Sequence, residues 1–144
     1  MSAIAKTEAV VLRTMKYGET SVIVTLYTKQ FGKLSGLAKG ARHSKSKYGS
    51  ALQPLAHIQA MVYRKEGRDL QTIGQCSTLD DFRHILEDLP RMAIGMKVIE
   101  LLNMIAHEEE ENLPLFTLVV SSLIALDHAD KNPENLFYAF QISL

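Results

Sequence analysis

The sequence predicts an α+β protein in which a small barrel of five strands precedes a helical region. β-branched and aromatic residues dominate short segments of the first half, whereas apolar residues recur at three- and four-residue steps in the second half. The charge changes sign at the same place. Residues 1–75 carry 12 Lys and Arg against four acids, or +8, and residues 76–144 carry four against 12, or −8. A basic half of this kind predicts a polyanionic partner.

The first half divides into five strand-like segments: 7–17, 20–28, 32–41, 57–64 and 70–77. Gly18 and Glu19 supply turn chemistry between the first two segments, and the polar residues 65–69 do so between the last two. A unit of this size, with internal glycines where strands bend, fits the Greek-key OB-fold barrel, whose strands 2 and 3 face oligonucleotides. An SH3-like barrel fits nearly as well on strand count. We expect the OB-fold domain to span residues 1–79.

Residues 80–144 predict a helical domain. Segments 89–106 and 112–128 are amphipathic, and each has a proline in its first turn, where a missing N–H is harmless. A third helix is expected to begin at Pro133. Its apolar residues Phe137, Phe140 and Leu144 form a stripe, which predicts self-association through this C-terminal helix.

Metal and catalytic chemistry find little support in the sequence. The single cysteine, Cys76, excludes an internal disulfide and any multi-cysteine zinc pattern, and the five histidines are scattered without ligand spacing. Neither a phosphate-binding loop nor a nucleophile elbow occurs, and Ser44 and Ser46 have no identifiable base. The sequence therefore predicts no metal, no cofactor and no enzyme. Because no apolar run is long enough to span a membrane, we expect a cytoplasmic location and no membrane partner.

Residues 32–47 are the strongest candidate for a binding site, because they carry five basic side chains, no acid and several glycines. Lysine and arginine side chains neutralise phosphates without reading sequence. The predicted nucleic-acid-binding residues are Lys33, Lys39, Arg42, Lys45 and Lys47, with Arg13 of the first strand ranked below them. The alternative is a solvated loop. Candidates for base stacking are Tyr17, Tyr27 and Phe31, although aromatics in a small barrel more often belong to its core.

The chain resembles the N-terminal part of the bacterial recombination-mediator family RecO. The resemblance is carried by VLRTMKYGE at 11–19, TLYTKQFGKLSGLAKGAR at 25–42 and ALQPL at 51–55. It implies an OB-fold followed by a helical domain, here incomplete relative to the family. It also implies binding of single- and double-stranded DNA, strand annealing and RecA loading at the nucleoid. The partners it implies are RecR and the tail of single-stranded-DNA-binding protein.

Two other functions fit the fold and charge without the resemblance. One is an OB-type module that binds RNA. The other is a protein-interaction adaptor whose basic barrel meets an acidic protein.

Overall fold

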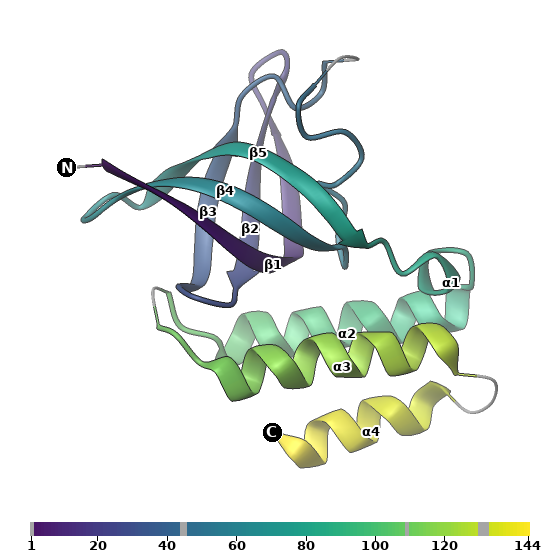
Figure 1. The fold of residues 1–144 in the computed structure, drawn as a ribbon. Helices are drawn as coiled ribbons and strands as arrows, with labels where there is room; N and C mark the ends of the chain where they lie inside the picture. Colours follow the sequence, from purple (N-terminus) through teal and green to yellow (C-terminus); the bar gives the residue numbers. More distant parts are fainter. Residues whose placement is uncertain (1, 44–45, 109, 130–132) are drawn as a thin grey trace.

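The computed structural model describes residues 2–43, 46–108, 110–129 and 133–144. Figure 1 shows a sheet of five strands above a layer of helices, which confirms the predicted α+β class. The strands are β1 (Ser2–Tyr17), β2 (Ser21–Thr28), β3 (Gly32–Ala38), β4 (His57–Lys65) and β5 (Leu70–Asp80). The helices are α1 (Arg83–Leu86), α2 (Leu89–Ile105), α3 (Leu113–His128) and α4 (Pro133–Ser143). The short helix α1 has no counterpart among the predicted elements, and β5 extends one residue into the predicted helical domain.

The five strands close into a barrel in the order β1-β2-β3-β5-β4. Strand β1 makes closure possible because it is 16 residues long and has two partners. Its first part pairs with β4 from Ser2 to Val10, and its second part pairs with β2 from Ala9 to Tyr17. The register shifts between Val11 and Arg13, and a bulge of this kind bends a strand and increases its twist. Among the pairings of the five described strands, the short β3–β5 pairing is parallel and the others are antiparallel.

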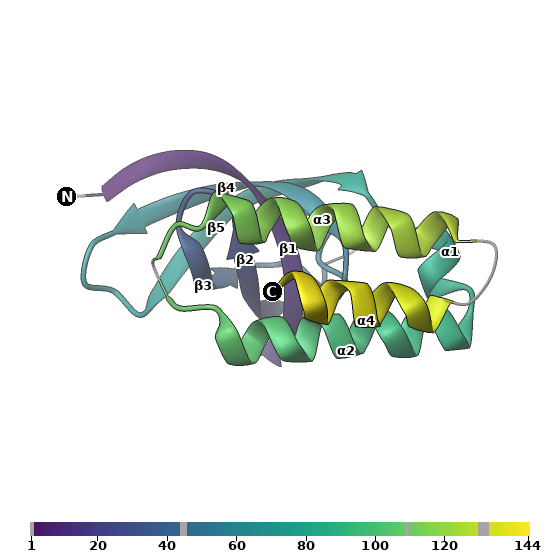
Figure 2. The same cartoon turned by 90° about the horizontal axis from the view of Figure 1, so that it is seen from below.

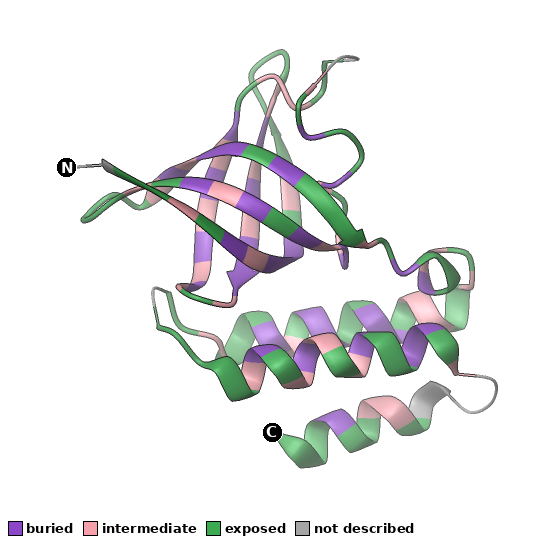
Figure 3. Ribbon diagram, viewed as in Figure 1, coloured by how far each residue is buried: buried purple, intermediate pink, exposed green. Residues whose placement is uncertain are grey.

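The barrel interior follows the two-residue alternation of the strands. Val22, Val24 and Leu26 of β2 point inward and are almost completely buried. Tyr48, in the loop between β3 and β4, closes the interior, and its hydroxyl donates a hydrogen bond of 2.7 Å to the carbonyl of Ile73. Figure 3 shows the resulting alternation of buried and exposed residues along each strand.

A second apolar core lies between the barrel and the helices. Val10, Leu12 and Tyr27 of the barrel belong to the same buried cluster as Leu102 of α2 and Phe116 of α3. Seen from below, α2 and α3 run side by side beneath the barrel, and α4 packs on both (Figure 2). Side-chain caps begin the two long helices: Asp88 accepts from the Arg91 N–H, and Asn112 from the Leu115 N–H.

The C-terminal helix differs from its prediction. Phe140 is 1% exposed and Phe137 is half-buried, because this side of α4 packs on α2 and α3. The stripe predicted to be uncovered is thus largely buried within the chain. Exposed apolar side chains of this helical end are Tyr138, Ile142 and Leu144. Self-association through α4 stays a prediction, and it would now depend on these three side chains.

Gly32 joins the barrel to the helical layer. Its φ is 65°, and a Cβ atom here would overlap the backbone of Glu110 in the segment between α2 and α3. The Lys33 N–H donates to the carbonyl of His107 at 3.2 Å in the same region. Gly40 has a similar φ of 71° but has open space where a Cβ would lie.

These two glycines allow a matched test of this contact. Gly40→Ala should lower the free energy of unfolding by about 1 kcal/mol through left-handed backbone strain alone. Gly32→Ala should lower it by about 3 kcal/mol, because it adds overpacking to the same strain. Urea denaturation of both variants measures the difference, and equal losses would show that the close approach at Gly32 does not matter.

Candidate nucleic-acid interface

One outer side of the barrel carries a mixed surface of apolar, polar and basic side chains on β1, β2 and β3. Because Val22, Val24 and Leu26 point inward, the residues that alternate with them point outward. We call this surface the β1–β2–β3 face. The strand registers arrange it in the rows Arg13–Thr25–Ser35, Met15–Ile23–Leu37 and Tyr17–Ser21.

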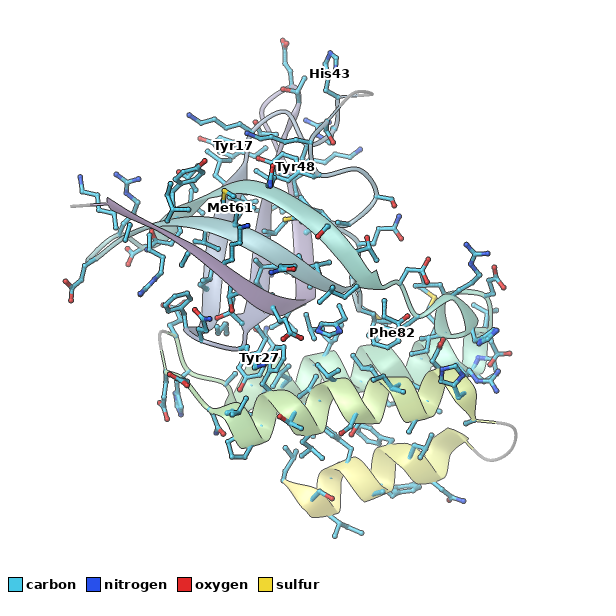
Figure 4. The ribbon with its side chains drawn as sticks, in the orientation of Figure 1. Tyr17, Tyr27, His43, Tyr48, Met61 and Phe82 are labelled. Carbon is cyan, nitrogen blue, oxygen red and sulfur yellow. The ribbon has the colours of Figure 1, made fainter. Side chains whose placement is uncertain are left out.

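The β1–β2–β3 face offers both charge and stacking surface. Arg13 is exposed beside the bulge, and Tyr17 is 53% exposed at the end of β1. Figure 4 shows Tyr17 at the end of the barrel far from the helices. Met15, between them in register, is 49% exposed and can cover an unpaired base. Sequence reasoning missed Met15 and its neighbours Ile23 and Leu37, although alternation within segment 20–28 was a signal for the outward position of Ile23.

Further basic side chains lie at the same end of the barrel as Tyr17, although Lys16, which pairs with the inward-pointing Val22, is not part of this face. Lys39 follows β3 directly and is exposed, and Lys16 is exposed near the end of β1. Arg42 is exposed as well, but its guanidinium donates hydrogen bonds to the carbonyls of Ser21 at 3.1 Å and Gly18 at 2.5 Å. Arg42 therefore holds the β1–β2 turn while keeping its charge at the surface. We call Lys16, Lys39 and Arg42 the basic rim; Glu19, in the same turn, is an acid beside it.

The structure separates the other predicted basic residues from this rim. Lys33 lies at the opposite end of β3, about 20 Å along the strand from Lys39, and its ammonium donates to the carbonyl of Asn103 on α2 at 3.3 Å. Lys47 lines a cavity of about 330 Å³ over β4 and β5 together with Lys6. Lys45 lies outside the described residues. The basic stretch 32–47 is thus spread over three parts of the barrel.

The three candidate stacking residues also have different surroundings. Tyr17 has an exposed ring. Phe31 is half-buried, and the guanidinium of Arg64 lies 4.1 Å from its ring centroid. Tyr27 is 1% exposed, and its ring lies 5.9 Å from that of Phe116, measured between centroids. No base can reach Tyr27, so it takes the core role that the sequence left as the alternative.

Burial also changes the acidity of Tyr27. Loss of solvent, with a smaller contribution from the charge of Glu110, raises its pKa to about 12. Glu110 belongs to the acidic segment between α2 and α3, and Glu108 of that segment forms β-bridges with Gly32 and Lys33. Glu108 and Glu110 therefore lie at the end of β3 opposite Lys39. The face is polarised, with basic residues at one end and acids near the other.

The architecture and this face together define a class of protein. A closed barrel of order β1-β2-β3-β5-β4, with exposed aromatic and basic residues on its first three strands, is typical of OB-fold modules that bind nucleic acid. Within the described residues, the longest helices are too short or too polar to cross a lipid bilayer.

Comparison with known proteins identifies the family. Residues 1–82 match the family model described as recombination protein O N terminal, and residues 86–144 match the one described as recombination protein O C terminal. The chain is 42% identical over 142 residues to a DNA repair protein RecO of Salinibacter ruber. It is 37% identical over 141 residues to that of Chlorobium limicola and 33% identical over 141 residues to that of Chloroherpeton thalassium. The chain belongs to the RecO family of DNA repair proteins.

The matches cover nearly all of this chain but only part of each relative. They include 99% of this chain and 55% of the Salinibacter ruber protein, and 98% of this chain and 54% of the Chlorobium limicola protein. The chain spans about half the length of the curated relatives it matches.

Tyr27 supplies a test of the core between the barrel and the helices. A buried tyrosine with a raised pKa stabilises the fold below its ordinary pKa of 10, and this contribution is lost as the pH rises toward 12. The Tyr27→Phe variant lacks the titrating group. Between pH 9 and pH 11, the wild type should therefore lose about 1 kcal/mol more stability than the variant does. Urea denaturation at the two pH values measures this, and parallel losses would contradict the burial of Tyr27.

Proposed function

We propose that this chain is the DNA-binding part of a recombination mediator. It binds single- and double-stranded DNA on the β1–β2–β3 face and the basic rim, and works by holding strands together rather than by catalysis. The observation that carries the proposal is the register of β1, β2 and β3. Arg13, Met15 and Tyr17 follow one another on the exposed side of β1, and Lys39 follows the end of β3, which pairs with β2. Family membership supports DNA over RNA or an acidic protein as the ligand.

The chemistry of the face fits a single strand. Phosphates need distributed positive charge without base specificity, which Arg13, Lys39 and the rest of the basic rim provide. Bases need flat or apolar surfaces, which Tyr17 and Met15 provide. No row of the face presents a fixed set of donors and acceptors like that needed to read a base edge in a duplex groove. Binding should therefore be independent of sequence.

Annealing follows from the same arrangement. A protein that neutralises phosphates reduces the repulsion between two complementary strands, and stacking holds bases unpaired until they meet. In the proposed pathway the chain acts with RecR to load RecA, and the acidic tail of single-stranded-DNA-binding protein brings it to coated strands. Family membership supports these partners. Cytoplasmic, nucleoid-associated action is part of the same proposal.

The charge contacts predict a steep salt dependence. If three or four phosphates are neutralised, the logarithm of the association constant should fall with the logarithm of salt concentration with a slope of roughly −2 to −3 on single strands. The double variant Arg13→Ala/Lys39→Ala should make the slope shallower by about 1.4. Fluorescence anisotropy with two unrelated oligonucleotides, at several salt concentrations, measures both values.

The matched control removes two charges from a different side of the barrel. The double variant Lys6→Ala/Lys47→Ala removes two positive charges from the lining of the cavity over β4 and β5. Its salt slope should stay within about 0.3 of the wild-type slope. If the control variant has a shallower salt slope and the Arg13/Lys39 variant keeps the slope of the wild type, the DNA path lies over β4 and β5.

Competition with RNA of the same sequence separates a DNA mediator from an RNA module, because a mediator should prefer DNA.

Stacking is tested separately from charge. Tyr17→Ala should weaken single-strand binding by about 5- to 150-fold without changing the salt slope, because a stacked base contributes about 1–3 kcal/mol and releases no ions. Tyr17→Phe keeps the ring and should bind like the wild type. The same anisotropy titration measures both variants, and equal affinity of Tyr17→Ala and the wild type would remove Tyr17 from the interface.

A further inference from the structure

Three side chains with metal-binding atoms meet where α1 lies against the end of α3. They are His84 of α1 and Asp127 and His128 of the last turn of α3. Their ligand atoms all lie within 4.8 Å of one another. We propose that they bind a divalent transition-metal ion, with zinc as the best match, and that the ion fixes α1 to α3.

The donor set suits this class of ion. Two imidazole nitrogens and one carboxylate oxygen are ligands that zinc and its first-row neighbours accept, whereas calcium and magnesium prefer oxygen alone. With bonds of about 2.0–2.2 Å and tetrahedral angles, ligand atoms lie about 3.4 Å apart. The Asp127 Oδ2 atom lies 3.8 Å from His84 Nδ1 and 3.9 Å from His128 Nε2. The two Asp127 distances must each shorten by about 0.5 Å, and the imidazole nitrogens, which lie within 4.8 Å of each other, must approach by up to about 1.4 Å.

Asp127 is already held in place for this role. Its side chain is only 7% exposed, and its Oδ1 atom accepts a hydrogen bond of 3.1 Å from the Ile85 N–H. The other oxygen, Oδ2, faces both imidazoles at distances longer than a hydrogen bond. A buried carboxylate needs a cationic partner, and a metal ion supplies one with more charge than a histidine does.

The two histidine side chains can move to meet an ion. Their side chains are 61% and 65% exposed, so each ring can rotate toward an ion without disturbing the core. Their ring centroids are 6.1 Å apart, which leaves space between them. Three protein ligands leave at least one position of the ion for water.

The surrounding charges are compatible with a bound cation. The site lies at the C-terminal end of α3, where the helix dipole favours positive charge. Arg91 of α2 contacts the C-terminal end of α3. Its guanidinium is engaged with the carbonyls of Leu126 and Ala129 and with the carboxylate of Asp88. Arg83, next to His84, is exposed to solvent.

This inference differs from the sequence expectation of no metal site. His84 is separated from Asp127 by more than forty positions, so no spacing pattern joins them. Cys76 takes no part, because it is buried in the barrel and burial raises the pKa of its thiol to about 12. A metal at this site would hold the junction between barrel and helices, since α1 follows β5 directly.

The test uses chelator-treated protein titrated with Zn²⁺ in a calorimeter. We expect one ion per chain and a rise in Tm of about 5–10 °C at a hundredfold excess over Kd. His84→Ala and His128→Ala should each weaken binding at least tenfold and abolish the rise in Tm. Asp127→Asn keeps the acceptor for Ile85 and removes the charge, so it should fold and bind at least tenfold more weakly.

The matched control is His107→Ala, which removes an exposed histidine from the segment between α2 and α3. It should bind Zn²⁺ like the wild type. Equal affinity of His84→Ala, His128→Ala and His107→Ala would overturn the site and indicate scattered surface binding. Absence of stoichiometric binding to the wild type would overturn it as well. Both outcomes are independent of DNA binding, which is measured on the barrel.

Discussion

The structure depends on strand β1 having buried side chains on both of its faces. Ala9 and Val11 point into the barrel, while Val10 and Leu12 point into the core shared with the helices. The alternation of a strand makes this possible only if both sides are covered, and α2 and α3 provide the second cover. Barrel closure and helix docking therefore rest on the same four consecutive residues, and a shift of register by one would exchange the two cores.

The same strand changes character at its bulge. From Ala9 to Leu12, just at the bulge, both faces are buried, and after it Arg13, Met15 and Tyr17 are exposed on the outside of the barrel. The bulge thus marks the point where β1 leaves the helices and begins the proposed DNA surface. Hydrogen bonds from Arg42 to the carbonyls of Gly18 and Ser21 hold the turn that follows Tyr17. Rigid support lowers the entropy lost when a base stacks.

The basic and acidic residues of the two halves also lie in different parts of the structure. The acidic segment between α2 and α3 contacts β3 at Gly32 and Lys33. The C-terminal ends of β1 and β3, which carry Lys16 and precede Lys39, lie at the end of the barrel away from the helices (Figure 1). Lys33 is therefore occupied by the chain itself, through the carbonyl of Asn103. In the proposed complex, a polyanion that approaches the basic rim would meet positive charge first and the acidic segment between α2 and α3 last. Such an arrangement would orient the ligand as well as attract it.

The sequence by itself determined the periodicities and hence the elements: the five strands, the two long helices with a proline in the first turn of each, and the barrel-then-helix order. These are local properties, because alternation, capping and turn chemistry act over a few residues. The family resemblance was likewise readable from segments 11–19 and 25–42.

Tertiary structure alone decided which basic residues share a surface. Strand register and the path of the loop after β3 separate Lys33, Lys39 and Lys47, although they are close in sequence. It also decided that Tyr27 is core while Tyr17 is exposed, and that His84 meets Asp127 and His128, because contacts between distant segments are set by packing and leave no spacing in the sequence.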